Sequence, residues 1–307
     1  MTKVAVVQTA SVPFDTPATV EKMTGLIDEA AAAGAELAVF PEAFIGGYPK
    51  GLGFGTVVGV RRPEGRELYD RYSRCAIELD GPEMATVAKA AAKANLFVVV
   101  GVIERAAGTL YCTIVMISPT QGMVGYHRKL MPTAGERFIW GFGDGSTMPV
   151  VDSPAGKLGA VICWENYMPL LRTAMYAQGI EIYCAPTADD RPTWAPTMQH
   201  IAIEGRVFVL SACQAIKVSA YPDDLDLELL PPNEEYAMRG GSMIVDPMGQ
   251  VLAGPVFEEE TILYADVDLA VKQGGHLDLD VTGHYARPDV FALTVDIAPK
   301  SAVAFVG

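Results

Sequence analysis

Short apolar runs alternate with alanine-rich amphipathic stretches in the first part of the chain. The apolar runs are rich in Val, Ile and Phe, which is typical of buried strands, and the stretches between them have helical spacing. Pro17 falls in the first turn of one predicted helix and Gly34 follows its last apolar residue, as expected for a helix start and stop. The predicted strands are residues 4–7, 37–40 and 97–103, and the predicted helices are 16–34 and 82–95.

The later part of the chain repeats this alternation and adds hairpins. Turn-forming residues separate paired apolar runs, which predicts antiparallel strands. The predicted strands are residues 111–117, 123–129, 150–152, 158–162, 180–185, 207–212, 241–245, 249–253 and 261–267, with helices after residue 163 up to about 179 and at 196–206. The order β-α-β-α-β-β-β therefore occurs roughly twice, which indicates an α/β protein whose two similar halves carry their helices outside the sheets.

Three segments lack this pattern. Residues 45–80 read as an insertion with one short helix at about 67–77, residues 217–238 read as an acidic insertion, and the tail from His284 has little periodicity. We expect a single domain over residues 1–285 followed by an arm over residues 286–307.

Composition narrows the classes of function. The 307 residues carry a formal net charge of −14, which argues against partnership with nucleic acid or an anionic membrane surface. The apolar run at the N-terminus is too short for a signal-peptide core, and residues 96–103 are too few to span a bilayer. The five cysteines form no close pair, and neither CxxC nor HExxH occurs, so we expect free thiols, no metal site and a cytoplasmic protein.

Cys163 stands at a junction with a specific chemistry. The predicted strand 158–162 ends immediately before it, and Glu165 and Asn166 mark the entry to a helix. Unpaired backbone N–H groups at a helix start favour an anion, so we expect an exposed sulfur that forms a thiolate readily. The alternative is a core filler, because cysteine is among the most buried residue types.

Two further charged residues follow predicted strands. Glu42 comes after strand 37–40 and Lys129 ends strand 123–129, so both can reach the sheet edge at which Cys163 lies. A carboxylate that takes the thiol proton, an ammonium that stabilises developing negative charge and a thiolate that attacks form a sensible catalytic unit. The alternatives are an exposed loop acid and a solvated lysine, the latter being what we expect of Arg128.

Separated blocks of the chain resemble the nitrilase branch of the carbon–nitrogen hydrolases, in order and over nearly the whole length. The blocks are residues 40–49, 127–133, 136–145, 163–170, 185–189 and 283–289. The resemblance implies a four-layer α-β-β-α sandwich of two similar halves, with no metal or cofactor. It also implies that Glu42 is the general base, Lys129 the stabilising cation, Cys163 the nucleophile and Glu136 a second glutamate that orients the lysine and substrate.

The implied activity is hydrolysis of a small-molecule nitrile to a carboxylic acid and ammonia through a thioimidate and a thioester. An amidase or a cyanide-degrading hydrolase using the same residues is the alternative, and a catalytically silent scaffold is a third possibility. The expected pocket walls are Tyr48, Thr133, Trp164 and Tyr167, with Trp140 a weaker candidate; the backbone N–H of Trp164 resembles an oxyanion donor. Plain packing is the competing interpretation of these aromatic residues.

The resemblance also implies self-association into dimers or larger homo-oligomers. The predicted helix over residues 166–178 carries Met168, Leu171, Met175 and Tyr176, which we expect to pack against the same helix of a second copy. The two insertions are candidate contacts for open spirals, which form when head-to-tail contacts do not close.

Overall fold

The computed structural model describes residues 1–307 except 226, 228–229, 231–233, 302 and 304–307. Its first sheet contains β1 (Thr2–Gln8), β2 (Leu37–Val39), β5 (Phe97–Ala106), β6 (Thr109–Ser118), β7 (Gly122–Arg128) and β15 (Thr261–Val267). The strand order is β15-β1-β2-β5-β6-β7. β1, β2 and β5 are parallel, whereas β5, β6 and β7 form antiparallel pairs. The carboxyl ends of β1 and β2 therefore meet at one edge of this sheet.

The second sheet repeats much of this arrangement. It contains β8 (Val151–Ser153), β9 (Gly156–Ala160), β10 (Ile182–Cys184), β11 (Phe208–Ser211), β12 (Ala215–Lys217), β13 (Tyr236–Val245) and β14 (Val251–Phe257). The order is β12-β13-β11-β10-β9-β8, with β14 also paired to β13. β9, β10 and β11 are parallel, so each half has a parallel centre with antiparallel neighbours.

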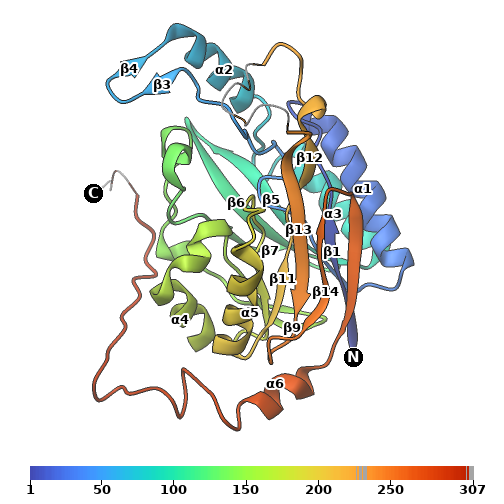
Figure 1. The fold of residues 1–307 in the computed structure, drawn as a ribbon, viewed down its shortest axis with the longest axis vertical. Coiled ribbons are helices and arrows are strands. Elements are labelled where there is room, and N and C mark those ends of the chain that lie inside the picture. Colours follow the sequence, from blue (N-terminus) through green and yellow to red (C-terminus); the bar gives the residue numbers. More distant parts are fainter. Residues whose placement is uncertain (226, 228–229, 231–233, 302, 304–307) are drawn as a thin grey trace.

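The helices and sheets form four layers (Figure 1), and clusters of buried apolar side chains lie between them. The helices α1 (Thr16–Ala32) and α3 (Pro82–Ala94) cover the first sheet, and α4 (Pro169–Ala177) and α5 (Trp194–Gly205) cover the second. Val4 and Val6 of β1 face the core between the sheets, while Ala5 and Val7 face the helices. Both faces of the central strands are thus buried, which explains their continuous apolar runs. The α-β-β-α sandwich expected from the sequence is confirmed.

Some predicted elements have other boundaries. The helix expected at 67–77 is α2 (Pro63–Ser73), because Pro63 occupies its first turn, and a small hairpin of β3 (Thr56–Val57) and β4 (Val60–Arg61) precedes it. The helix expected directly after Cys163 is a 3₁₀ turn over Cys163–Tyr167, and α4 begins only at Pro169. Part of the second predicted insertion, 217–238, lies outside the described residues.

The prediction that the apolar side chains of the helix at 166–178 pack against a second copy is wrong for most of these residues. Leu171, Met175 and Tyr176 are buried inside the protomer, where they pack on the second sheet. Leu170, which precedes them, is 67% exposed. Most of the apolar face of this helix therefore packs against the second sheet of the same protomer.

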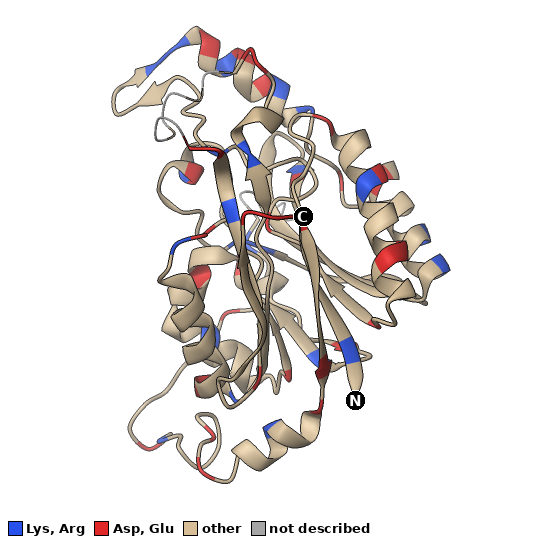
Figure 2. Ribbon diagram, turned by 45° about the vertical axis from the view of Figure 1, so that its right-hand side comes forward, with Lys and Arg blue, Asp and Glu red and all other residues tan. Residues whose placement is uncertain are grey.

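After α6 (Leu269–Gly275) the chain runs in an extended path outside the sandwich and returns toward α4 (Figure 1). Acidic and basic residues are interspersed on the outer helices and loops, with few on the central strands (Figure 2). None of the helices in the described part of the chain combines the length and the apolar character needed to cross a bilayer.

Candidate active site

Cys163 occupies a strained turn between the second sheet and α4. Its φ is +50°, a left-handed conformation that costs a residue with a side chain about 1–2 kcal/mol. Hydrogen bonds hold this turn: the Cys163 N–H donates to Pro186 O at 2.9 Å, and the buried Asn166 amide donates to Cys163 O at 2.7 Å. Strain held by surrounding contacts of this kind is typical of functional sites.

Three charged side chains meet beside this sulfur. Lys129 Nζ lies 2.7 Å from Glu42 Oε1 and 2.7 Å from Glu136 Oε2. Lys129 and Glu42 are fully buried and Glu136 is 9% exposed. One buried cation therefore bridges two carboxylates, and such an arrangement is stable only because each buried charge has a partner.

Each member of this group is supplied by the end of a different element. Glu42 follows β2, and Lys129 follows β7, where its N–H donates to Cys112 O at 2.8 Å. Glu136 lies in a 3₁₀ turn over Ala134–Phe138. A cavity of about 200 Å³ opens onto Cys163 and Glu136, and Tyr48 and Trp164 also line it. The structure thus brings the four predicted residues Glu42, Lys129, Glu136 and Cys163 to one place.

The protonation state of the Cys163 thiol differs from the one expected from the sequence. Cys163 is buried, 4% exposed, and its turn is not the open start of an α-helix. Burial, and next the Glu42 carboxylate, raise the pKa of the Cys163 thiol well above its usual range, so the resting sulfur carries its proton. The expectation of an exposed, readily formed thiolate was therefore wrong.

The same burial prepares Glu42 to receive that proton. Desolvation raises the pKa of Glu42, while Lys129 and the Cys163 thiol act in the opposite direction. Burial alone would lower the pKa of Lys129, but the carboxylate of Glu42 and the other acidic groups nearby raise it well above the ordinary value. Glu42 Oε2 has no hydrogen-bond partner among the described residues. A carboxylate with one free oxygen beside a protonated thiol is arranged as a general base.

A second buried pair ties the lysine segment to the cysteine segment. Glu165 Oε2 accepts from Ile162 N at 2.9 Å and Glu165 Oε1 from Leu130 N at 2.5 Å. His127 Nε2 lies 3.0 Å from Glu165 Oε2, and its Nδ1 lies 2.6 Å from Thr147 O. Because a carbonyl only accepts, Nδ1 carries a hydrogen. Our sequence reasoning assigned no role to this pair, although His127 and Glu165 lie within the resembling blocks.

The predicted pocket walls divide into two groups. The Tyr48 hydroxyl donates to Glu136 Oε1 at 2.7 Å, and the N–H of Thr133 donates to Glu136 Oε2 at 2.6 Å, so both hold this glutamate at the cavity. Trp164 is 41% exposed at the mouth, whereas Tyr167 lies beyond it, packed between Trp164 and Trp194.

Trp140 is a buried core residue. It is 2% exposed and packs edge-on against Tyr48, with Lys129 Nζ 5.7 Å from its ring centre. Arg128, expected to be a solvated charge, instead donates through Nε to the buried Glu104 at 2.8 Å and through a second nitrogen to the same carboxylate.

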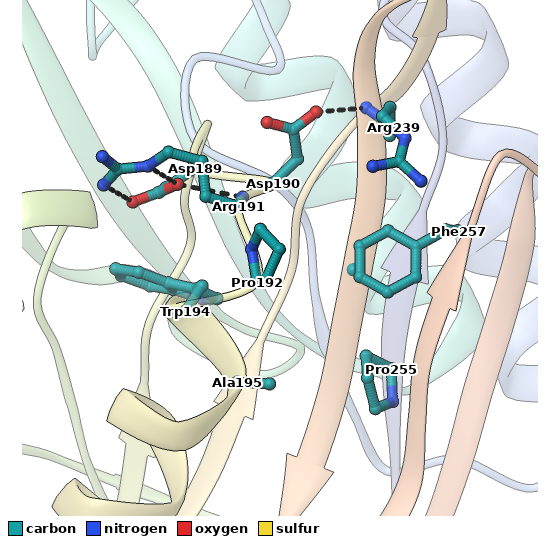
Figure 3. A pocket seen from close by; sticks show the side chains of 10 residues that line it. Asp189, Asp190, Arg191, Pro192, Trp194, Ala195, Arg239, Pro255 and Phe257 are labelled. Atoms are coloured by element: carbon teal, nitrogen blue, oxygen red, sulfur yellow. Dashed lines mark hydrogen bonds and ion pairs between the residues drawn. The ribbon is translucent and has the colours of Figure 1, made fainter.

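The segment after β10 forms another wall that sequence reasoning did not identify. Asp189 accepts from Arg191 and, at 2.8 Å, from Trp164 Nε1, and the Arg191 guanidinium lies 4.7 Å from the Trp164 ring centre. A second cavity of about 320 Å³ lies on this segment and is lined by Trp194, Phe257 and Pro255. Figure 3 shows these side chains and the hydrogen bond between the Arg239 N–H and the Asp190 carboxylate. Asp189, Asp190 and Arg191 thus line both cavities.

Comparison with known proteins agrees with this site. The chain belongs to the carbon–nitrogen hydrolase family, whose sequence model matches residues 3–274. It is 61% identical over 304 residues to a nitrilase of Bradyrhizobium diazoefficiens, covering 99% of this chain and 95% of the relative. It is also 57% identical over 301 residues to an aliphatic nitrilase of Sinorhizobium fredii, covering 98% and 97% of the two chains.

These similarities place the protein in the nitrilase branch of that family, as its sequence blocks indicated. Among solved structures, the fold resembles the NitFhit protein of C. elegans with a TM-score of 0.75 at 21% identity, covering 98% of this chain and 68% of that one.

Proposed function

We propose that the protein hydrolyses an organic nitrile to the carboxylic acid and ammonia, with Cys163 as nucleophile, Glu42 as general base, Lys129 as the stabilising cation and Glu136 as the residue that orients it. The supporting observation is the bridge that Lys129 Nζ makes at 2.7 Å to each of two buried carboxylates, beside the sulfur that borders the cavity. The nitrilase relatives support the choice of a nitrile as substrate.

The first half of the reaction attaches the substrate to sulfur. Glu42 takes the Cys163 proton as the sulfur adds to the nitrile carbon; a C–S bond forms and one π pair of the C≡N bond moves to nitrogen. Lys129 stabilises that charge, and Glu42 returns the proton to nitrogen, giving a thioimidate. The backbone N–H of Trp164 is the proposed second donor.

Two waters complete the reaction. The first adds to the thioimidate carbon as Glu42 accepts one of its protons and passes it to nitrogen, which leaves a tetrahedral carbon bearing OH, NH2 and sulfur. The C–N bond then breaks as the C=O bond forms, and the hydroxyl proton moves to the departing nitrogen, so that ammonia and a thioester result. The second attacks the thioester carbon, the C–S bond breaks, and the sulfur regains a proton. If the C–S bond breaks before the C–N bond, the product is an amide.

The substrate assignment is tested by ammonia release from a panel of aryl, arylacetyl and aliphatic nitriles, measured beside their amides. We expect turnover of at least one nitrile class with its amide turned over at least tenfold more slowly. Turnover of the amides without the nitriles would identify an amidase, the alternative consistent with the same residues. Turnover of neither, together with no preferential electrophile labelling of Cys163 over Cys184, would indicate a silent scaffold.

We also propose that the protein works in the cytoplasm as a homo-oligomer of one hydrolase domain, residues 1–285, with residues 286–307 as an arm. Its cysteines are buried free thiols, which suits a reducing compartment. The arm exposes apolar side chains, including Phe291 at 77% and Ile297 at 71%. A hollow of about 490 Å³ lies between the arm and α4, and a second copy is the proposed occupant of this surface.

Placing charge on the arm is expected to weaken self-association. Phe291→Asp combined with Ile297→Asp puts two charges where the apolar contact is proposed, so light scattering should show a smaller assembly than for the unmodified protein. Met123→Asp, at an exposed apolar position on β7, is the matched control and should leave the mass unchanged. A monomeric unmodified protein would contradict the proposal.

A further inference from the structure

Thr187 directs its hydroxyl at the reacting sulfur. Its Oγ lies 3.2 Å from Cys163 Sγ, and the residue is fully buried in the segment that follows β10. The same oxygen accepts the N–H of Asp189 at 2.9 Å. A hydroxyl has one hydrogen to donate, and an incoming N–H occupies a lone pair, so the hydrogen of Thr187 is left to point at the sulfur.

The position of this hydroxyl is fixed by the backbone. The Thr187 N–H donates to Ala212 O at 2.9 Å, and the preceding carbonyl, that of Pro186, accepts the Cys163 N–H at 2.9 Å. Residues 186 and 187 therefore hold Cys163 through its main chain and its side chain together. A β-branched side chain has few χ1 alternatives, so the donor is already oriented before a substrate arrives.

We propose that Thr187 is a further catalytic residue, which donates a hydrogen bond to Cys163 Sγ and stabilises the thiolate when the sulfur loses its proton to Glu42 and again when the C–S bond breaks. Glu42 and Thr187 then act in opposite senses on one atom. The nearby carboxylate disfavours negative charge on the sulfur, while the hydroxyl favours it, as does Lys129. Thr187 supplies the donor that the buried sulfur would otherwise lack from water.

The inference rests on the proposed role of Cys163 as nucleophile but not on the identity of the substrate. Its test is therefore a reaction without nitrile: alkylation of Cys163 by iodoacetamide from pH 6 to 10, followed by mass spectrometry of the peptide. Thr187→Val keeps the shape and removes the hydroxyl, and Thr187→Ser keeps the hydroxyl as the matched control. A hydrogen bond to a charged group is worth enough to change such a rate by about tenfold.

We expect alkylation of the Thr187→Val protein to be about tenfold slower than that of the unmodified protein at each pH below the thiol pKa, and that of Thr187→Ser to stay within about twofold. Loosened packing would have the opposite effect, because greater access to a buried sulfur speeds alkylation. Thr187→Ala is the second removal variant if Thr187→Val does not fold. Equal or faster alkylation of the hydroxyl-free protein, or equal slowing in Thr187→Ser, overturns the proposal. If alkylation is slower in the Thr187→Val protein but the unmodified protein hydrolyses no nitrile, the proposed role of Thr187 stands and the proposed substrate class is wrong.

Discussion

Replacing Cys163 by alanine is expected to lower kcat/KM for nitrile hydrolysis by about 10⁴-fold or more, because the substitution removes the sulfur that forms the covalent intermediate. Glu42, Lys129 and Glu136 remain in place, so substrate binding persists and the loss falls mainly on kcat. The measurement is ammonia release under saturating nitrile, with mass spectrometry to show that no adduct accumulates.

The matched control is Cys184→Ala. Cys184 is fully buried and is a strand residue of the core between the sheets. Its removal leaves a small cavity and is expected to lower stability by about 1 kcal/mol, with kcat/KM changed less than about threefold. Comparable loss of activity in both variants would show that any buried thiol matters to folding and would remove Cys163 from the role of nucleophile.

Lys129→Met is expected to have the largest effect on stability. The substitution leaves Glu42 and Glu136 buried without the cation that joins them, and an uncompensated buried charge costs about 3–5 kcal/mol. Urea unfolding should therefore shift strongly to lower concentration, and activity should be lost with it. Lys22→Met breaks the partly exposed pair with Glu260 and should cost less than about 1 kcal/mol.

Two measurements distinguish the loss of stability in the Lys129→Met protein from its loss of catalytic activity. Lys129→Met combined with Glu42→Gln and Glu136→Gln removes all three charges and should recover much of the stability while remaining inactive. Burial already raises the pKa of Glu42, and Lys129 is the main influence that lowers it. Without the lysine the folded state holds a proton there more tightly than the unfolded chain, so the stability deficit should shrink as the pH falls. A deficit independent of pH would contradict this account.

The alternation of apolar runs predicted an α/β protein with helices outside its sheets, because both faces of strands such as β5 and β10 are buried. The four-layer sandwich was implied by the family resemblance. The first residues of two helices were predicted less well: α2 begins at Pro63 and α4 at Pro169, and neither is the expected start. Pairing between distant strands was not predicted. Nothing in residues 261–267 indicates that β15 joins β1 of the first sheet and not its neighbours in sequence.

In the candidate active site, too, the sequence indicated some of the residues and not others. Glu42, Lys129 and Cys163 lie at the ends of predicted strands, so their placement allowed them to meet at one sheet edge, and the resemblance selected this trio from the other possible sets. Thr187 and Glu165 had no comparable signal, because they act through hydrogen bonds to residues distant in sequence: Thr187 to Cys163, 24 residues away, and Glu165 to His127, 38 residues away. Burial was misjudged for Cys163, because a residue after a strand is read as exposed until the packing of the opposite sheet is known.

The pairing of β15 with β1 has a consequence for synthesis on the ribosome. All seven residues of β1 are matched by residues 261–267, so this edge of the N-terminal sheet stays uncovered until most of the polypeptide has been translated. Apolar edges of this kind are templates for misassembly between nascent chains. The N-terminal half therefore has an unpaired strand edge during most of synthesis, and removing residues after 260 would leave that edge without its partner strand.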